Sequence, residues 1–179
     1  MIVYSATKEQ FQLDVLSNDI ENIILAAYFK ATGRYVALSE IRSWANSLQN
    51  MERVLSTDEI APDSGIAIEY HLPRSSKRID FIITGRGEDQ REAVVLIELK
   101  QWQSAGITEL DGVVTTVVGG GTPELAHPSY QAWSYKSMPE DYNATVEEEG
   151  IDLHPCAYLH NYVPDEVIRN VRPSLPRSN

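Results

Sequence analysis

A chain of 179 residues, 42% of them hydrophobic, is long enough to form one globular domain with a buried core. Its formal net charge of −11 argues against a broad nucleic-acid-binding surface, because phosphate backbones are held mainly by lysine and arginine, so any such face has to be local. The single cysteine excludes an internal disulfide bond, which agrees with a reducing cytoplasm.

The amino-terminal part of the chain is predicted to be helical. Thr7 to Gln10 has the form of a capping box, and apolar residues at helical spacing follow it. Asn18 or Asp19 can cap a second helix that ends at Gly33. Glu21 lies in the first turn of this second helix. It could reach a metal site from there, or it could simply favour the positive end of the helix dipole.

An amphipathic helix and a strand follow. From Ser39 to Leu55 the apolar residues recur every three or four positions, which predicts a helix that packs against a sheet. Gly65 to Leu72 is typical of a strand, in which Glu69 occupies the face opposite to Ile68 and Tyr70. Glu69 is therefore either an additional carboxylate of a metal site or, as the default, a surface charge.

The segment from Arg78 to Trp102 predicts a β-hairpin and carries the candidate catalytic residues. Two β-branched runs flank a polar turn. Because side chains alternate across a strand, Glu98 and Lys100 share one face. If the turn is centred near residues 88 and 89, Asp80 lies opposite Glu98, where paired Cβ atoms are about 5 Å apart.

Two adjacent carboxylates repel each other unless a proton, a cation or Lys100 lies between them. A divalent metal is one solution, since Mg²⁺ prefers oxygen ligands, and Lys100 could then orient or help to deprotonate an attacking water. The alternative is a solvated ion-pair ladder, which many antiparallel sheets carry. The spacing of Asp80, Glu98 and Lys100 alone leaves both interpretations open.

Beyond the hairpin, Gly112 to Val118 predicts another strand. The glycines at 119–121 are not followed by Gly-Lys-Ser/Thr, so we expect no nucleotide binding in this chain. Pro128 suits the first turn of a helix, which places Gln131 and Tyr135 on one face. Tyr135 could serve a site on that face, or it could be a core aromatic residue.

The remaining elements alternate between helix and strand. We expect Pro139 to end the helix and to start a second, glutamate-rich one that closes at Gly150. Leu153 to Tyr162 predicts a last strand, and Asp165 to Asn170 a short helical turn. Residues 171–179 have the composition of an irregular tail, so we expect one domain over residues 1–170.

No apolar run approaches the roughly eighteen residues needed to span a bilayer, and the amino terminus lacks a signal-peptide pattern. These features favour a cytoplasmic protein that does not contact membranes.

Two motifs resemble a known superfamily. Asp80 with Glu98-Leu99-Lys100 resembles the active-site signature of the PD-(D/E)XK nucleases, although Ile79 stands where the signature has proline. The segment from Gln131 to Tyr135 resembles the Q-x-x-x-Y motif that follows Glu-x-Lys in RecB-like members. Residues 1–170 are similar to the amino-terminal domain of bacterial proteins that join such a nuclease to a Schlafen-type helicase domain.

The resemblance implies an α/β fold with a restriction-endonuclease-like core, in which a central mixed β-sheet is flanked by helices and preceded by an N-terminal helical segment. It also implies a metal-dependent nuclease that hydrolyses phosphodiester bonds in DNA or, as the less favoured choice, RNA. Asp80 and Glu98 would hold one or two Mg²⁺ or Mn²⁺ ions, with the Leu99 carbonyl as a further ligand. Lys100 would position the water or stabilise charge on the phosphate.

In the same resemblance, Gln131 and Tyr135 would support the substrate or the active-site carboxylates. The implied setting is a bacterial nucleic-acid-processing or phage-defence system, and the implied partner is a helicase domain or motor subunit, fused or separate, that delivers the strand. The alternative function is a catalytically inactive nuclease-like domain that binds nucleic acid or assembles with other proteins.

Overall fold

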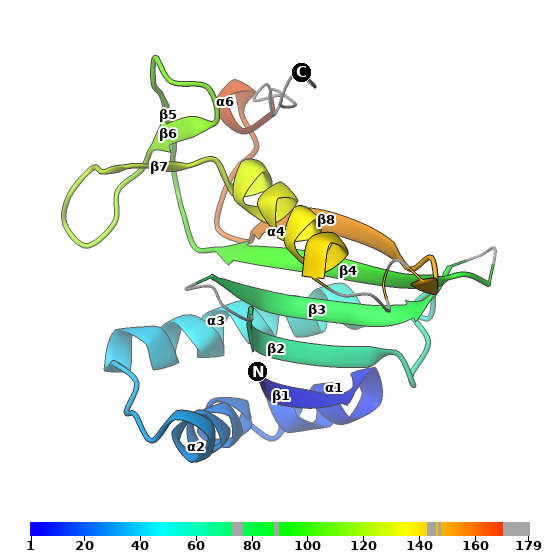
Figure 1. The fold of residues 1–179 in the computed structure, drawn as a ribbon. Coiled ribbons are helices and arrows are strands. Elements are labelled where there is room, and N and C mark those ends of the chain that lie inside the picture. Colours follow the sequence, from blue (N-terminus) through cyan, green and yellow to red (C-terminus); the bar gives the residue numbers. More distant parts are fainter. Residues whose placement is uncertain (73–76, 88–89, 143–145, 147, 170–179) are drawn as a thin grey trace.

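The chain folds around a five-stranded sheet with the strand order β1-β2-β3-β4-β8 (Figure 1). The computed structural model describes residues 1–72, 77–87, 90–142, 146 and 148–169. Strands β1 to β4 pair antiparallel with their neighbours, and β8 pairs parallel with β4, so the sheet is mixed. Its strands are β1 (Ile2–Thr7), β2 (Gly65–His71), β3 (Arg78–Arg86), β4 (Glu92–Lys100) and β8 (Asp152–Leu159).

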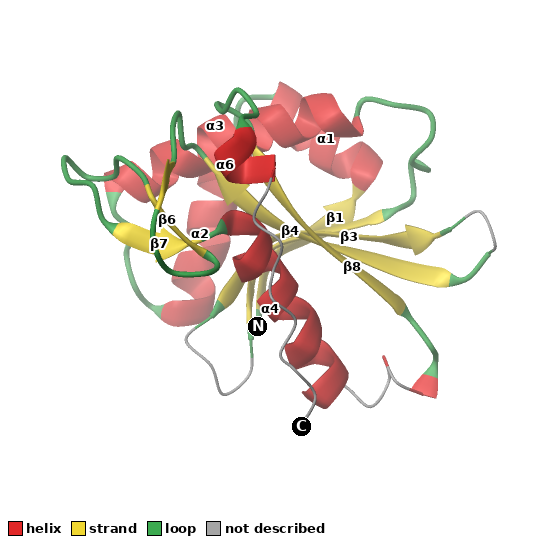
Figure 2. Cartoon of the chain, turned by 90° about the horizontal axis from the view of Figure 1, so that it is seen from above, coloured by secondary structure: helices red, strands yellow, loops and turns green. Residues whose placement is uncertain are grey.

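Helices cover both faces of this sheet (Figure 2). One face carries the three amino-terminal helices, α1 (Lys8–Leu16), α2 (Ile20–Thr32) and α3 (Leu38–Leu55). The other face carries α4 (Pro128–Tyr142), which packs against β4 and β8. The coarse prediction of an α/β protein with a mixed sheet between helices is therefore confirmed.

A separate apolar core fills each side of the sheet. On the side of α1 to α3, the rings of Phe11 and Phe81 meet edge to face at 5.4 Å between centroids, and both residues are fully buried. On the side of α4, Ile82 and Leu96 pack with Tyr135. The alternating strand residues thus point into two different cores, as expected for a sheet that is covered on both faces.

Several element ends agree with the sequence signals. The Thr7 hydroxyl accepts the Gln10 backbone N–H at 3.2 Å and caps α1. Helix α2 ends at Gly33, whose φ of 68° is left-handed and favours glycine. The hairpin pairs Arg86 with Glu92 next to the turn, as its centre near residue 89 predicts.

The fold differs from the sequence-based prediction in three places. Residues 2–7, to which the sequence analysis assigned no element, form the edge strand β1, because Tyr4 pairs with Ile68 on β2. The strand predicted over 112–118 shrinks to β6 (Val113–Thr115) and belongs to a second sheet. That three-stranded sheet is completed by β5 (Gly106–Ile107) and β7 (Glu124–Ala126).

The third difference concerns Pro139, which was expected to end a helix and does not. Helix α4 continues to Tyr142, because a proline in the last turn removes only one N–H from the ladder. The glutamate-rich helix predicted to close at Gly150 falls largely on residues outside the described part of the chain. The helical turn near the carboxyl end is α6 (Glu166–Arg169).

Among the described residues, no helix is long and apolar enough to cross a membrane.

Candidate active site

Strands β3 and β4 stop pairing with each other at the end of the sheet that carries the motif. Their ladder runs to the pair Phe81 and Ile97. Beyond that pair, β3 continues beside β2 and β4 continues beside β8. The Asp80 carboxylate enters this opening, where its Oδ2 accepts the backbone N–H of Leu99 at 3.0 Å. The register of the ladder, extended by one pair, aligns Asp80 with Glu98 as the sequence predicted.

Among the described residues, three side chains donate to Glu98. Lys100 Nζ and Gln131 Nε2 lie 2.6 and 2.8 Å from its Oε1, and the Tyr135 hydroxyl donates to its Oε2 at 2.6 Å. Only 3% of the Glu98 side chain is exposed. Since α4 places residues four apart on one face, Gln131 and Tyr135 reach the carboxylate together and also bond to each other at 2.9 Å. Tyr135 is therefore both an aromatic residue of the core and a hydrogen-bond donor to Glu98.

Asp80 is the less firmly bound carboxylate of the pair. Burial and the nearby negative charge of Glu98 raise its pKa, while the Leu99 N–H, Arg78 and Lys100 act in the opposite direction. The Arg78 Nε atom is 3.8 Å from Asp80 Oδ1, which is too long for a hydrogen bond. The site thus holds two close carboxylates, and a cation between them would relieve their repulsion.

A second set of charges borders Asp80. The Arg78 Nη1 atom lies 2.7 Å from Glu40 Oε1 on α3 and 2.8 Å from Glu69 Oε2 on β2. Glu69 is 2% exposed and also accepts the indole N–H of Trp44 at 2.8 Å. The prediction of a surface charge at Glu69 is therefore wrong, because Arg78 and Trp44 compensate for its burial.

The backbone explains why Glu69 turns inward. Ile68 packs on the side of α3 and Tyr70 on the side of α4, although regular alternation would place both on one face. Glu69 between them has a φ of 57°, a left-handed value that is uncommon for a residue with a side chain. This local distortion directs the Glu69 carboxylate to Trp44 on α3, and it is invisible to a pattern of alternating residues.

The free energy of unfolding is expected to fall as the pH rises from about 4.5 to about 7, because of Glu69. Burial raises the pKa of this carboxyl from 4.5 to about 7, against the opposing effects of Arg78 and Trp44. Between these values the folded state keeps a proton that the unfolded state releases. The stability that this proton contributes is fully present below pH 4.5 and is lost as the pH rises to about 7. Between these pH values the free energy of unfolding falls by at most about 1.4 kcal/mol per pH unit.

Denaturant unfolding of the wild type and of Glu69→Gln across this pH range measures the effect. The variant cannot titrate at position 69, so its stability should decline less steeply with pH than that of the wild type. Equal slopes for the two proteins would show that Glu69 does not titrate in this range.

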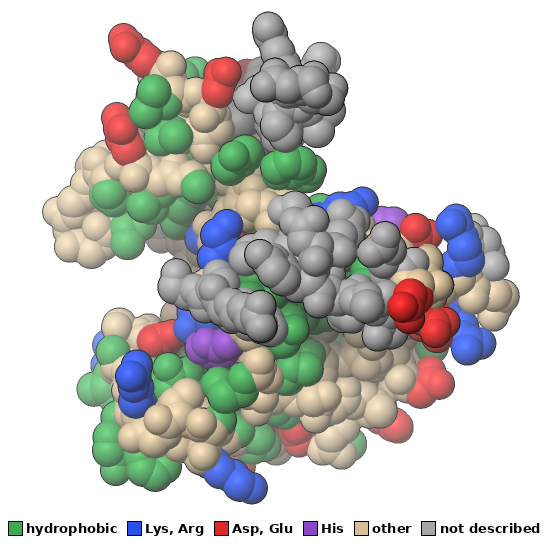
Figure 3. Space-filling view, in the orientation of Figure 1, with side chains coloured by type: hydrophobic (Ala, Val, Ile, Leu, Met, Phe, Trp, Pro, Cys, Tyr) green, Lys and Arg blue, Asp and Glu red, His purple; other side chains and the backbone are tan. Residues whose placement is uncertain are grey.

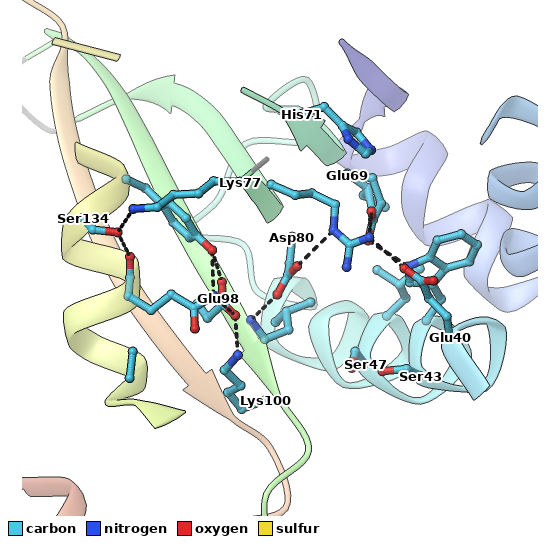
Figure 4. Close-up of a pocket in the computed structure, with 18 of the residues that line it drawn as sticks. Glu40, Ser43, Ser47, Glu69, His71, Lys77, Asp80, Glu98, Lys100 and Ser134 are labelled. Atoms are coloured by element: carbon cyan, nitrogen blue, oxygen red, sulfur yellow. Dashed lines mark hydrogen bonds and ion pairs between the residues drawn. The ribbon is translucent and has the colours of Figure 1, made fainter. Parts of the chain in front are cut away.

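These residues line one cavity of about 710 Å³ between α3, the ends of β2 to β4, and α4 (Figure 4). In the space-filling view, the surface is hollowed between the small sheet and the main body, with basic and histidine side chains near the hollow (Figure 3). Lys77 reaches from the β3 side to α4, where its Nζ lies 3.3 Å from the Ser134 hydroxyl.

The structure brings most of the predicted site residues together. The cavity is lined by seven of them, namely Glu69, Asp80, Glu98, Leu99, Lys100, Gln131 and Tyr135. Glu21 is not among the lining residues, and it lies in the first turn of α2. Among the described lining residues, the carboxylate that comes from a helix is instead that of Glu40, in the first turn of α3. In the sequence, Glu40 has the same signal as Glu21, an acid at a helix start, so the two could not be told apart.

The described donors leave acceptor capacity on the carboxylates of this site. Among the described residues, no group of three or more histidine, cysteine, aspartate or glutamate side chains is arranged to hold a metal ion. The described donors around Glu98 use three of the roughly four acceptor positions of a carboxylate. Within the described part of the chain, the basic side chain recorded beside Asp80 Oδ1 is that of Arg78, at 3.8 Å. Asp80 and Glu98 therefore offer carboxylate oxygens, the type of ligand that Mg²⁺ or Mn²⁺ prefers.

Comparison with known proteins leaves the family of this chain open. No protein-family model, no curated protein and no solved structure matches it significantly. Function therefore has to be argued from the site itself.

Proposed function

We propose that this chain is a metal-dependent phosphodiesterase that cleaves nucleic acid, with DNA favoured over RNA. The observation that carries the proposal is the meeting of Asp80, Glu98 and Lys100 in one cavity, at the place where β3 and β4 separate. The order of these residues resembles the PD-(D/E)XK signature, and the mixed sheet is compatible with a restriction-endonuclease-like core.

The chain's own groups divide the work in this proposal. Asp80 and Glu98 would hold Mg²⁺ or Mn²⁺, which when bound makes a water molecule more acidic and polarises the phosphate. The ammonium of Lys100, which lies 2.6 Å from Glu98, stabilises negative charge that develops on the phosphate or directs the attacking water. Gln131 and Tyr135 fix the orientation of Glu98 through their two hydrogen bonds. Burial of this carboxylate keeps bulk water from competing for it.

Delivery of the strand is also part of the proposal. The chain carries a net charge of −11, and nonspecific contacts of a small basic patch are typically as weak as ~10⁻⁴–10⁻⁶ M. We therefore expect efficient cleavage to need a helicase domain or a motor subunit, and we expect ATP to have no effect on this chain alone.

Metal titration with matched variants tests the proposal. Asp80→Asn keeps an oxygen that can accept the Leu99 N–H, and Glu98→Gln keeps the size of the side chain. Both variants are expected to lose Mn²⁺ binding in calorimetry and to lower Mn²⁺-dependent cleavage at least about 100-fold. Glu109→Gln is the control, since Glu109 is an exposed acid that does not line the cavity.

Two outcomes would contradict the proposed function. If Mn²⁺ binds equally well to the wild type and to both site variants, or if purified wild type cleaves neither DNA nor RNA with any divalent metal, the phosphodiesterase proposal is wrong. A chain that binds nucleic acid without cleaving it would then fit the alternative, an inactive binding or assembly module.

A further inference from the structure

One aromatic side chain that lines the cavity is exposed beside the candidate active site. Tyr130 lies in the first turn of α4 and lines the same cavity as Asp80 and Glu98. It directly precedes Gln131, which bonds to Glu98 at 2.8 Å. Tyr130 is 40% exposed, whereas Tyr135 one turn later is 2% exposed. Tyr130 and Tyr135 therefore differ in surroundings, and of these two it is Tyr130 whose ring is accessible to a ligand.

The Tyr130 ring is held in place by its neighbours. It stacks on Trp133 with 6.1 Å between centroids and 29° between the ring planes. On another side it lies against the backbone of Gly112, where an added Cβ would come 3.5 Å from the ring. Gly112 has a left-handed φ of 72°, so a side chain is disfavoured at this position. A ring that is already ordered loses little entropy when a flat ligand stacks on it.

The described part of the cavity carries few basic side chains. Among the described residues, three basic side chains from lysine or arginine line it, namely Lys77, Arg78 and Lys100. Arg78 is paired with Glu40 and Glu69, and Lys100 is paired with Glu98. Proteins that bind duplexes through the backbone commonly contact about 6–10 phosphates. With a net charge of −11, much of the affinity has to come from a different source.

We propose that Tyr130 forms a stacking subsite for an unpaired nucleobase next to the phosphate that is cleaved, so that the chain takes single-stranded nucleic acid. The inference rests on the proposed function for the position of the phosphate. In a duplex both faces of an internal base are covered by its neighbours, whereas an unpaired base has a free face for the ring. Stacking of this kind tolerates any sequence, because every base has a π face.

Binding without cleavage tests the inference. A labelled oligothymidylate, an abasic strand of the same length and a matched duplex are titrated in the presence of EDTA, with anisotropy as the readout. The wild type is expected to bind the oligothymidylate most tightly. Tyr130→Ala should weaken that binding roughly 5- to 150-fold, and Tyr130→Phe should retain it. Tyr35→Ala is the matched control, because Tyr35 is 86% exposed and lies on the loop between α2 and α3.

The abasic strand keeps the phosphates and lacks the bases, so it separates stacking from charge in the wild type without relying on any variant. Equal binding of the abasic strand and the oligothymidylate, or tighter binding of the duplex, would overturn the inference. The same holds if Tyr130→Ala binds like the wild type. Because these assays contain no metal, their failure leaves Mn²⁺-dependent cleavage untouched, and loss of cleavage in Asp80→Asn leaves the stacking result untouched.

Discussion

Replacing Lys100 with alanine is expected to slow cleavage about 100- to 1000-fold, while the fold and the affinity for Mn²⁺ are kept. The Lys100 side chain lies at the end of β4, lines the cavity of the site and belongs to neither apolar core, so its removal leaves both cores intact. Glu98 loses one donor but keeps the hydrogen bonds from Gln131 and Tyr135. The loss should therefore fall on the transition state, where a nearby cation stabilises new negative charge.

Single-turnover cleavage measures the rate, and calorimetry with Mn²⁺ measures the metal affinity. Lys30→Ala is the matched control, since Lys30 is an exposed lysine in the last turn of α2. If Lys100→Ala cleaves like the wild type, Lys100 has no part in the mechanism. If the variant loses Mn²⁺ binding together with cleavage, Lys100 organises the carboxylates and does not act on the reacting phosphate.

The hairpin could be predicted because two independent signals agree on it. The polar turn sets its centre, and the alternation of Ile97, Glu98, Leu99 and Lys100 sets which side chains share a face. A shift by one residue would have buried Lys100 in the core of α1 to α3. The helical spacing of Gln131 and Tyr135 likewise predicted that the two side chains lie together, since residues four apart meet on one face of α4.

The charges around Arg78 could not be predicted, because they depend on local backbone conformation and on tertiary packing. The left-handed φ of Glu69 places its side chain on the opposite face of the sheet from the one that alternation predicts. No residue type in β2 indicates this conformation. Glu40 and Glu21 both begin helices, and only the packing of α3 beside the cavity distinguishes them. The edge strand β1 was not predicted for a related reason. A short strand is defined by its pairing with a neighbouring strand, here β2, more than by the pattern of its own residues.

Tyr135 is expected to give the largest loss of stability in the site. Tyr135→Ala removes a 2% exposed ring from the core between the sheet and α4, which should cost about 3–5 kcal/mol. For a chain of this size each kcal/mol corresponds to roughly 2–4 °C, so the melting temperature should fall by about 6–20 °C. Thermal unfolding of the purified variant measures this change. Impaired cleavage by Tyr135→Ala alone would therefore say nothing about catalysis.

Tyr135→Phe separates the two roles of this residue. The ring stays in the core, while the hydroxyl that donates to Glu98 Oε2 at 2.6 Å is lost. A buried acceptor that loses its partner costs about 1–3 kcal/mol, so the melting temperature should fall much less than in Tyr135→Ala. Cleavage should still decline, since the described donors that then orient Glu98 are reduced to Gln131 and Lys100. If the phenylalanine variant melts lower and yet cleaves at the wild-type rate, Tyr135 is a core residue whose hydroxyl has no part in holding the catalytic carboxylate.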